Sequence, residues 1–216
     1  MNYNISNKAP AGFGLGENFN ITKFPLLDDT VNLNNVVKNG WYHWAASAPV
    51  NAPMSYCIMR VWSGYGGYAL QEVMTGHLNH ENVIMRRFTN GGESAWGEWE
   101  YVNPPMMAGV EYRTTERYGG HPVYAQRVIV KSIPTGTLIT LVPESTSLVR
   151  FECKIQQDDG LHEIWSPFFY GSIDSAYSAF TYVYKERTGA IRCNFNCGAN
   201  IDVDAAAYVT VWYTKD

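Results

Sequence analysis

Carboxylates, an imidazole and aromatic rings occur close together in two neighbouring segments of this sequence. The first segment, residues 158–165, is predicted to be a loop and contains Asp158, Asp159, His162 and Trp165, and the second contains Tyr170, Asp174 and Tyr177. The apolar faces of Trp and Tyr rings can lie against the C–H faces of a pyranose, while carboxylates accept hydrogen bonds from its hydroxyl groups. The residue types therefore predict carbohydrate contact at these positions. A second interpretation stays open, in which Trp165 and its neighbours Phe168 and Phe169 lie in a core or at a subunit interface.

Paired carboxylates also raise the question of hydrolysis. Glycosidases need two carboxyl groups on opposite sides of one bond, about 5–9 Å apart. Adjacent aspartates such as Asp28-Asp29 would point to opposite faces of a strand, and in a turn they serve the turn geometry. Asp158-Asp159-Gly160 is predicted to be a hairpin turn, and the sequence has no Gly-x-Ser-x-Gly pattern. We therefore predict no catalytic residues and no enzymatic activity.

The cysteines and histidines do not have the spacing of a metal site. Cys193 and Cys197 are separated by three residues, and no second cysteine pair accompanies them, although Cys153 would make a third ligand conceivable. His77 and His80 fall in a predicted polar loop. We predict no metal and no cofactor. Cys57 is predicted to be a buried free thiol; whether Cys193 and Cys197 are free, disulfide-bonded or metal-bound stays open.

The charge and hydropathy of the chain exclude several kinds of partner. The net charge is −4 and no dense cluster of Lys and Arg is present, so a nucleic-acid partner is not expected. Arg86-Arg87 is interpreted as a solvated strand face. No run of 18 or more apolar residues is present, which predicts no membrane insertion, and the N-terminus lacks a signal-peptide run. The 15 Tyr, 9 Phe and 7 Trp favour a β-rich protein that binds or oligomerises.

The chain divides into a short N-terminal segment and two β-rich parts. Residues 1–17 are rich in Asn, Ala and Gly and are predicted to be a connector. Residues 18–105 contain short strands at intervals of roughly 10 residues with Gly-rich turns, a pattern typical of an antiparallel sheet. Leu26 to Val37 is predicted to be extended or part-helical, with a short turn capped by Asp28-Asp29-Thr30. Pro104-Pro105 marks the boundary, since two prolines interrupt regular structure.

Residues 106–216 are predicted to form a second β unit. Its first element is a hairpin whose arms meet at Gly119-Gly120. In the first arm, Tyr112 and Thr114 share one face and Glu111 and Arg113 the other. Further strands end near residues 142, 155, 185, 195 and 214, and this number of strands is typical of a sandwich or jelly roll. The fold class is therefore all-β, a small β module followed by an antiparallel, jelly-roll-like β-sandwich head.

Several motifs resemble known sequences. The first part contains Gly40-Trp41-Tyr42, Gly67-Tyr68-Ala69-Leu70-Gln71, and Arg86-Arg87-Phe88-Thr89-Asn90-Gly91-Gly92 followed by Trp96-Gly97-Glu98-Trp99. With Asn51-Ala52-Pro53 before the next strand, these resemble the pyocin-knob domain. The hairpin, with Glu111-Tyr112-Arg113-Thr114-Thr115-Glu116-Arg117-Tyr118 and then His121-Pro122-Val123-Tyr124, resembles the distal parts of phage tail fibres.

This resemblance implies a function in host recognition. It implies a homotrimer in a tail fibre or tail tip of a phage or phage-tail-like particle, synthesised in the bacterial cytoplasm, that binds host cell-surface polysaccharide without cleaving it. The N-terminal connector would then contact other tail or baseplate proteins. Three alternatives stay open: a structural virion subunit without receptor binding, a monomeric carbohydrate-binding module, and an enzyme that degrades surface polysaccharide. The receptor, the host and the module that binds the receptor are not determined by the sequence.

Overall fold

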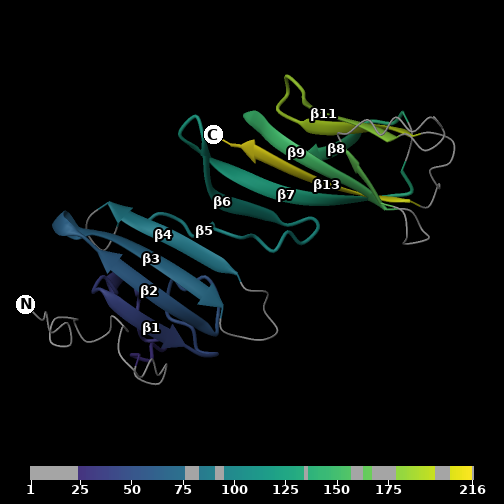
Figure 1. The fold of residues 1–216 in the computed structure, drawn as a ribbon. Coiled ribbons are helices and arrows are strands. Elements are labelled where there is room, and N and C mark those ends of the chain that lie inside the picture. Colours follow the sequence, from purple (N-terminus) through teal and green to yellow (C-terminus); the bar gives the residue numbers. More distant parts are fainter. Residues whose placement is uncertain are drawn as a thin grey trace, which may run out of the picture. The chain divides into compact units, whose positions relative to one another are not determined.

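The computed structural model describes residues 24–75, 83–90, 95–133, 136–156, 163–166, 179–197 and 205–215. Over these ranges the protein consists of β-strands with two short 3-10 helices, Leu33–Asn35 and Tyr65–Gly67, and it contains no α-helix (Figure 1). The predicted all-β fold class is therefore confirmed. None of the described helices has the length and apolar character needed to cross a membrane. The chain forms two compact units, Met1–Pro105 and Met106–Asp216.

The first unit contains an antiparallel sheet whose strands follow one another in chain order. The order is β1-β2-β3-β4-β5, with each strand paired to the next. The bounds are β1 Gly40–Trp44, β2 Cys57–Ser63, β3 Tyr68–Thr75, β4 Ile84–Asn90 and β5 Glu100–Tyr101. The turn between β2 and β3 contains Gly64, Gly66 and Gly67, as the spacing predicts. Local pairing of this kind produces a β-meander.

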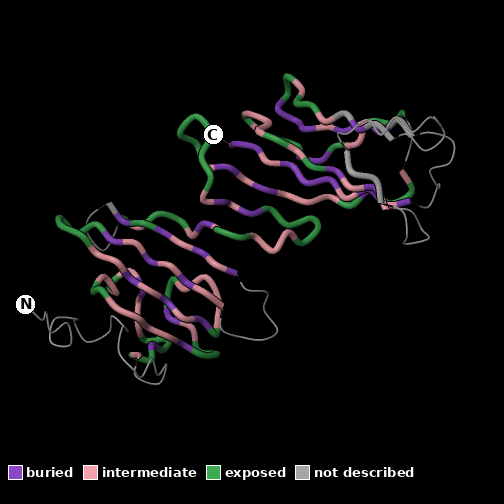
Figure 2. Tube along the Cα trace, in the orientation of Figure 1, coloured by how far each residue is buried: buried purple, intermediate pink, exposed green. Residues whose placement is uncertain are grey.

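One face of this sheet is packed against the segment that precedes it. Buried and half-buried residues alternate along β2 and β3, and Figure 2 shows this alternation as purple and pink. The buried side chains Met59, Val61 and Val73 pack with Leu33, which is fully buried. Asp28 accepts hydrogen bonds from the backbone N–H and hydroxyl of Thr30, at 3.0 and 2.5 Å. The predicted short turn at residues 28–30 and the part-helical character of this segment are confirmed, and the 3-10 helix itself is capped by Asn32.

The second unit contains two sheets. The larger has the order β6-β7-β13-β9-β10, and the smaller has three strands in the order β11-β12-β8. All described pairings in both sheets are antiparallel. The bounds are β6 Glu111–Tyr118, β7 His121–Lys131, β8 Ile139–Val142, β9 Ser147–Gln156, β10 Glu163–Ser166, β11 Ala179–Lys185, β12 Ile191–Cys197 and β13 Ala206–Thr214.

The two sheets of the second unit share one hydrophobic core. Val209 and Val211 of β13 and Ile155 of β9 are fully buried, in the same cluster as Ile191 and Phe195 of β12. The hydroxyl of Thr181 on β11 donates a hydrogen bond to the sulfur of Cys153 on β9, at 3.6 Å, and this bond links the two sheets. Side chains from the facing sheets therefore interdigitate, which is the packing of a β-sandwich and agrees with the predicted architecture.

The predicted hairpin is β6–β7, and its two arms alternate as the sequence indicates. Tyr112 and Thr114 are buried, while Glu111 is exposed. Gly119 and Gly120 both have positive φ, +59° and +87°, and connect Tyr118 directly to its partner His121. Two consecutive residues of this kind match the right-handed twist of the arms. The structure also contains a register shift between Arg113 and Arg117, which the sequence pattern did not predict.

Two expectations from the sequence are wrong. The stretch that ends at Trp165 was expected to be a loop, but Glu163–Ser166 is strand β10, because it pairs with residues Cys153 to Gln156 at the edge of β9. Arg87 was expected on a solvated face, but it is 4% exposed. Its guanidinium lies between the rings of Trp96 and Trp99, 4.6 Å from each, and its Nε donates to Gln71 at 2.9 Å.

Candidate functional site

The predicted sugar-contacting residues fall mostly outside the described residues. This applies to Asp158, Asp159, His162, Tyr170, Asp174 and Tyr177. The backbone of Trp165 is described, and it lies in β10 directly opposite Lys154 of β9. Lys154 in turn pairs with Tyr208 of β13, and Tyr208 with Ile129 of β7. Trp165 therefore belongs to a cross-strand row that runs over four strands of the larger sheet.

A groove lies on the outer face of this sheet, away from the sandwich core. Its volume is about 400 Å³, and it is lined by Arg127, Glu152, Lys154, Gln156, Tyr208 and Thr210. Strand alternation explains the lining, because Val209, Val211 and Ile155 point into the core and their neighbours point outward. We call this hollow the sheet groove. It contains two residues of the row that includes Trp165, namely Lys154 and Tyr208.

The chemistry of the sheet groove is polar with one aromatic wall. Thr210 is 3% exposed and forms part of the floor, where its hydroxyl accepts a hydrogen bond from Nε of Arg127 at 3.3 Å. Two basic side chains, Arg127 and Lys154, line the groove with one acidic side chain, Glu152. Such a surface can donate to hydroxyl and carboxylate groups and can place the ring of Tyr208 against an apolar face.

Farther along the same face, a second aromatic ring is covered by a neighbour. The guanidinium of Arg150 lies 4.3 Å from the ring of Trp212 and forms two bonds to Glu116, at 2.6 and 2.8 Å. The hydrogen bonds from Arg150 lower the pKa of the Glu116 carboxyl. Because Arg150 occupies this face of Trp212, Tyr208 is the ring that the groove offers to a ligand.

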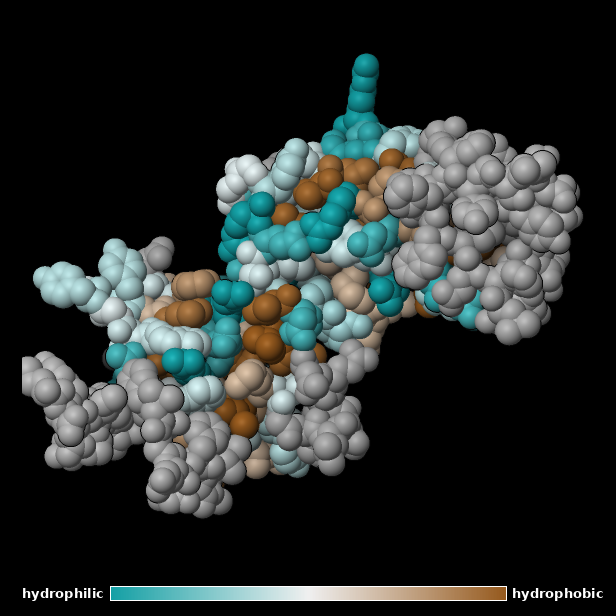
Figure 3. Space-filling model, viewed as in Figure 1, coloured by the Kyte–Doolittle hydropathy of each residue, from teal (hydrophilic) through white to brown (hydrophobic). Residues whose placement is uncertain are grey.

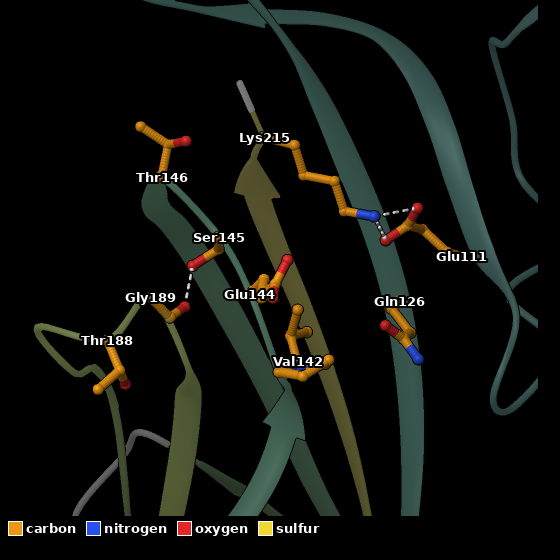
Figure 4. Close-up of a pocket in the computed structure, with 10 residues that line it drawn as sticks. Glu111, Gln126, Val142, Glu144, Ser145, Thr146, Thr188, Gly189 and Lys215 are labelled. Atoms are coloured by element: carbon orange, nitrogen blue, oxygen red, sulfur yellow. Dashed lines mark hydrogen bonds and ion pairs between the residues drawn. The ribbon is translucent and has the colours of Figure 1, made fainter.

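A second hollow opens at one end of the sandwich, and Figure 4 shows the residues that line it. Its volume is about 520 Å³. Glu111 of β6, Gln126 of β7 and Lys215 form one wall, and residues 142–146 with the turn residues Thr188 and Gly189 form the other. We call it the end cleft. It shares no lining residue with the sheet groove.

A network of polar groups fixes the first wall of the end cleft. Lys215 Nζ lies 2.6 Å from both carboxylate oxygens of Glu111. The hydroxyl of Tyr213 donates to the same carboxylate. Burial of Tyr213 raises the pKa of its hydroxyl, and the negative charge of Glu111 raises it further. The tyrosine therefore stays protonated and holds Glu111 in place.

Two buried cysteines of the described part do not offer reactive thiols. Cys57 and Cys193 are buried free thiols, as predicted for Cys57, and burial raises the pKa of each to about 12. A thiol with this pKa is protonated at neutral pH, and a protonated thiol is a poor nucleophile and a poor metal ligand. No group of three or more His, Cys, Asp or Glu side chains is arranged for metal binding within the described ranges.

Sequence reasoning missed the residues that line both hollows. The outward positions of Ser147–Gln156 and Ala206–Thr214 are mainly polar, and this alternation was a usable signal for a polar face on each strand, although not for the groove that the paired strands form. The end cleft has no such signal. Its walls come from three segments, near residues 111–126, 142–146 and 188–215, which only the folded chain brings together.

Comparisons with known proteins complete the description. No protein-family model matches the chain. No curated protein matches it either. Two solved structures are similar in part: the C-terminal regions of the P. aeruginosa R1 and R2 pyocin fibres, each 12% identical with a TM-score of 0.31. The matches cover 90% and 91% of this chain and 68% of each fibre chain. A TM-score this low carries no argument about this chain.

Proposed function

We propose that the chain is a fibre or tail-tip component of a phage or phage-tail-like particle, and that its second unit binds a host cell-surface polysaccharide without cleaving it. The first half of the proposal is supported by the sequence motifs at residues 86–99 and 111–124, which resemble the pyocin-knob domain and tail-fibre tips. The second half is carried by one observation: Tyr208, Lys154 and Trp165 lie in one cross-strand row that crosses the sheet groove.

The geometry of this row suits an extended polymer. Neighbouring strands are about 4.8 Å apart, so a row over four strands spans about 14 Å. A polysaccharide lying along the row would meet an aromatic face at Tyr208 and hydrogen-bond donors at Lys154 and Arg127. Because basic side chains outnumber acidic ones in the lining, the groove favours glycans that carry carboxylate or phosphate groups.

Repetition of the site would make such binding effective. A single sugar site of millimolar affinity contributes only about 4 kcal/mol. In a homotrimer the same groove occurs on each subunit, and further copies on one particle raise the apparent affinity by a factor on the order of a hundred. In this proposal residues 1–17 connect the chain to other tail or baseplate proteins.

The first test measures binding of the labelled protein to bacterial cells and to their purified surface polysaccharides. We expect Tyr208→Ala to weaken binding about tenfold, since it removes an aromatic contact worth about 1.4 kcal/mol. Tyr184→Ala is the matched control, because Tyr184 is an exposed tyrosine on β11 in the other sheet and should leave binding unchanged.

Three results would contradict the proposal. Equal losses in the Tyr208 and Tyr184 variants would exclude a specific role for the sheet groove. A fall in the chain length of the polysaccharide during incubation would identify an enzyme instead of a binding protein. A structural subunit without receptor binding would bind neither cells nor polysaccharide, with or without these substitutions.

A further inference from the structure

The walls of the end cleft are held in place by contacts within the chain. The β11–β12 turn packs directly on residues 144–145, because a Cβ added at Gly189 would lie 3.0 Å from the carbonyl oxygen of Ser145. The hydroxyl of Ser145 donates to the carbonyl of Gly189 at 2.8 Å, as Figure 4 shows. On the opposite wall, Tyr213 and Lys215 hold the carboxylate of Glu111. A preformed cleft avoids the cost of ordering its walls when a ligand binds.

The lining of the cleft selects a hydroxyl-rich ligand. Hydroxyl groups of Ser145, Thr146 and Thr188 and the amide of Gln126 face the hollow, and few apolar side chains do so. The hydroxyls of Thr146 and Thr188 and the amide of Gln126 can donate and accept hydrogen bonds, as sugar hydroxyls do, while the Ser145 hydroxyl, which donates to Gly189, can accept one. The volume of about 520 Å³ falls within the usual range for small-molecule sites. A polyol of the size of a sugar unit therefore fits the cleft better than an apolar molecule.

The charge of the cleft narrows the class of sugar. Its lining contains the carboxylates of Glu111 and Glu144 and the ammonium group of Lys215. Lys215 pairs with Glu111, which leaves the charge of Glu144 uncompensated by the lining. A negative site attracts a cationic ligand and disfavours an anionic one. The sheet groove has the opposite balance, with Arg127 and Lys154 against Glu152.

We infer that the end cleft is a second saccharide site, and that it takes an amino sugar in preference to a neutral sugar and excludes an acidic one. The ammonium group of the sugar faces Glu144, and its hydroxyl groups bond to the hydroxyl-bearing wall. The two hollows of the second unit then recognise different parts of a surface glycan, one acidic and one amino-bearing. The inference rests on the proposed function only in the choice of sugars as ligands.

The test titrates the full chain with three methyl glycosides, of glucosamine, glucose and glucuronic acid, and follows binding by calorimetry and saturation-transfer NMR. We expect affinity to fall in that order. Glu144→Gln should reduce the preference for glucosamine over glucose by about threefold, the effect of one exposed ion pair. Thr188→Trp should fill the mouth of the cleft and weaken all binding at least tenfold.

The matched control is Arg187→Trp, which places the same ring on the same exposed turn but outside the lining of the cleft. It should change affinity less than twofold, and thermal unfolding should confirm that both Trp variants are folded. Equal effects of Thr188→Trp and Arg187→Trp on binding would overturn the inference, as would an unchanged preference for glucosamine over glucose in Glu144→Gln. Absence of binding by all three glycosides would also overturn it.

The same panel distinguishes failure of the inference from failure of the proposed function. Tyr208→Ala should keep its binding of methyl glucosaminide, because Tyr208 does not line the end cleft. Thr188→Trp should keep its binding of acidic polysaccharide, because Thr188 does not line the sheet groove. If polysaccharide binds and none of the small glycosides does, the proposed function stands and the second site is rejected.

Discussion

Arg87 illustrates what a single residue contributes to the first unit. Arg87 is almost fully buried, and burial lowers the pKa of its guanidinium to about 10. The rings of Trp96 and Trp99 provide cation–π contacts to this buried charge. Gln71, which accepts its Nε–H, donates to the backbone carbonyls of Leu33 and Val36 at 2.7 and 2.9 Å. One chain of contacts therefore links β4 and β3 to the segment that covers the sheet.

We predict that Arg87→Ala lowers the free energy of unfolding by about 3 kcal/mol, because it leaves a buried amide oxygen of Gln71 without its donor and removes two cation–π contacts. Urea denaturation of the two proteins measures the difference. Arg60→Ala is the control, since Arg60 also lies near two Trp rings, at 5.3 and 4.2 Å, but is only half-buried. Arg60→Ala should lower the free energy of unfolding by about 1 kcal/mol. Equal losses in the two variants would contradict the idea that burial of Arg87 makes its contacts more stabilising.

The sequence identified some residue environments and not others. Alternation correctly placed Tyr112 and Thr114 on the buried face of β6, because neighbouring positions differ clearly in polarity. Arg86 and Arg87 are adjacent on one strand, so alternation places one of them on the inward face. The sequence does not show how a buried arginine would be stabilised there. Burial becomes tolerable through Trp96, Trp99 and Gln71, and their convergence on one point is a property of the folded sheet.

At the scale of elements, the turns are the best-predicted features. Gly119-Gly120 connects neighbouring antiparallel strands, as its composition indicates, and residues 187–190 connect β11 to β12. Strand β10 was missed because four residues with little alternation are too short for a reliable pattern, and pairing to β9 decides their conformation. The aspartates at 158–159 stay a turn prediction, since they lie outside the described residues.

Gly189 and Gly119 both lie in turns, but we expect different effects when each is replaced by Ala. Gly189 has φ of +92°, and an added Cβ would meet the backbone of Ser145 at 3.0 Å. We predict that Gly189→Ala destabilises the second unit by about 3 kcal/mol, the sum of left-handed strain and a backbone clash. Gly119 has φ of +59° with open space around its Cβ position.

Gly119→Ala should therefore cost only about 1 kcal/mol, the strain term alone. Chemical denaturation followed by near-UV circular dichroism compares the two variants. A larger effect at Gly119 than at Gly189 would mean that the turn at 187–190 does not pack against residues 144–145 as described. Gly189→Ala should also weaken the binding of methyl glucosaminide, since the turn forms one wall of the end cleft.

For the whole molecule, the exposed apolar side chains indicate further association. In the first unit Tyr65, Leu26, Tyr68 and Phe88 are between 49% and 100% exposed. Hydrophobic residues are visible at the surface in Figure 3, coloured brown. Large apolar side chains at this level of exposure are found at interaction sites. Contact between copies of the chain would cover them.

We predict that the purified protein has a solution mass near three times 24.3 kDa. Light scattering on a sizing column measures this mass independently of shape. A monomer would contradict the trimer and would favour a lone carbohydrate-binding module or an enzyme. Replacing both Tyr68 and Phe88 by Ser should shift the protein toward lower mass if the apolar surface of β3 and β4 contributes to the contact.

The fold class could be predicted at this scale, but the two hollows could not. Strand spacing and turn residues are local signals, and they were enough for an all-β chain with a sandwich. The sheet groove depends on β13 lying between β7 and β9, and strand order within a sheet is a matter of long-range pairing. No local pattern in the sequence specifies which strands become neighbours.

The position of β13 has a consequence for synthesis on the ribosome. β13 pairs along its whole length with both β7 and β9, although it follows them in the chain. Until residues 206–214 emerge, β6–β7 and β9–β10 are separate two-stranded hairpins with open edges, which are marginally stable and prone to pair with other chains. Translation from the end of β10 at Ser166 to the end of β13 at Thr214 takes about 3 to 10 s at ribosomal speed. Slower translation therefore lengthens the period of exposure to misassembly, and the yield of native protein should depend on the concentration of nascent chains.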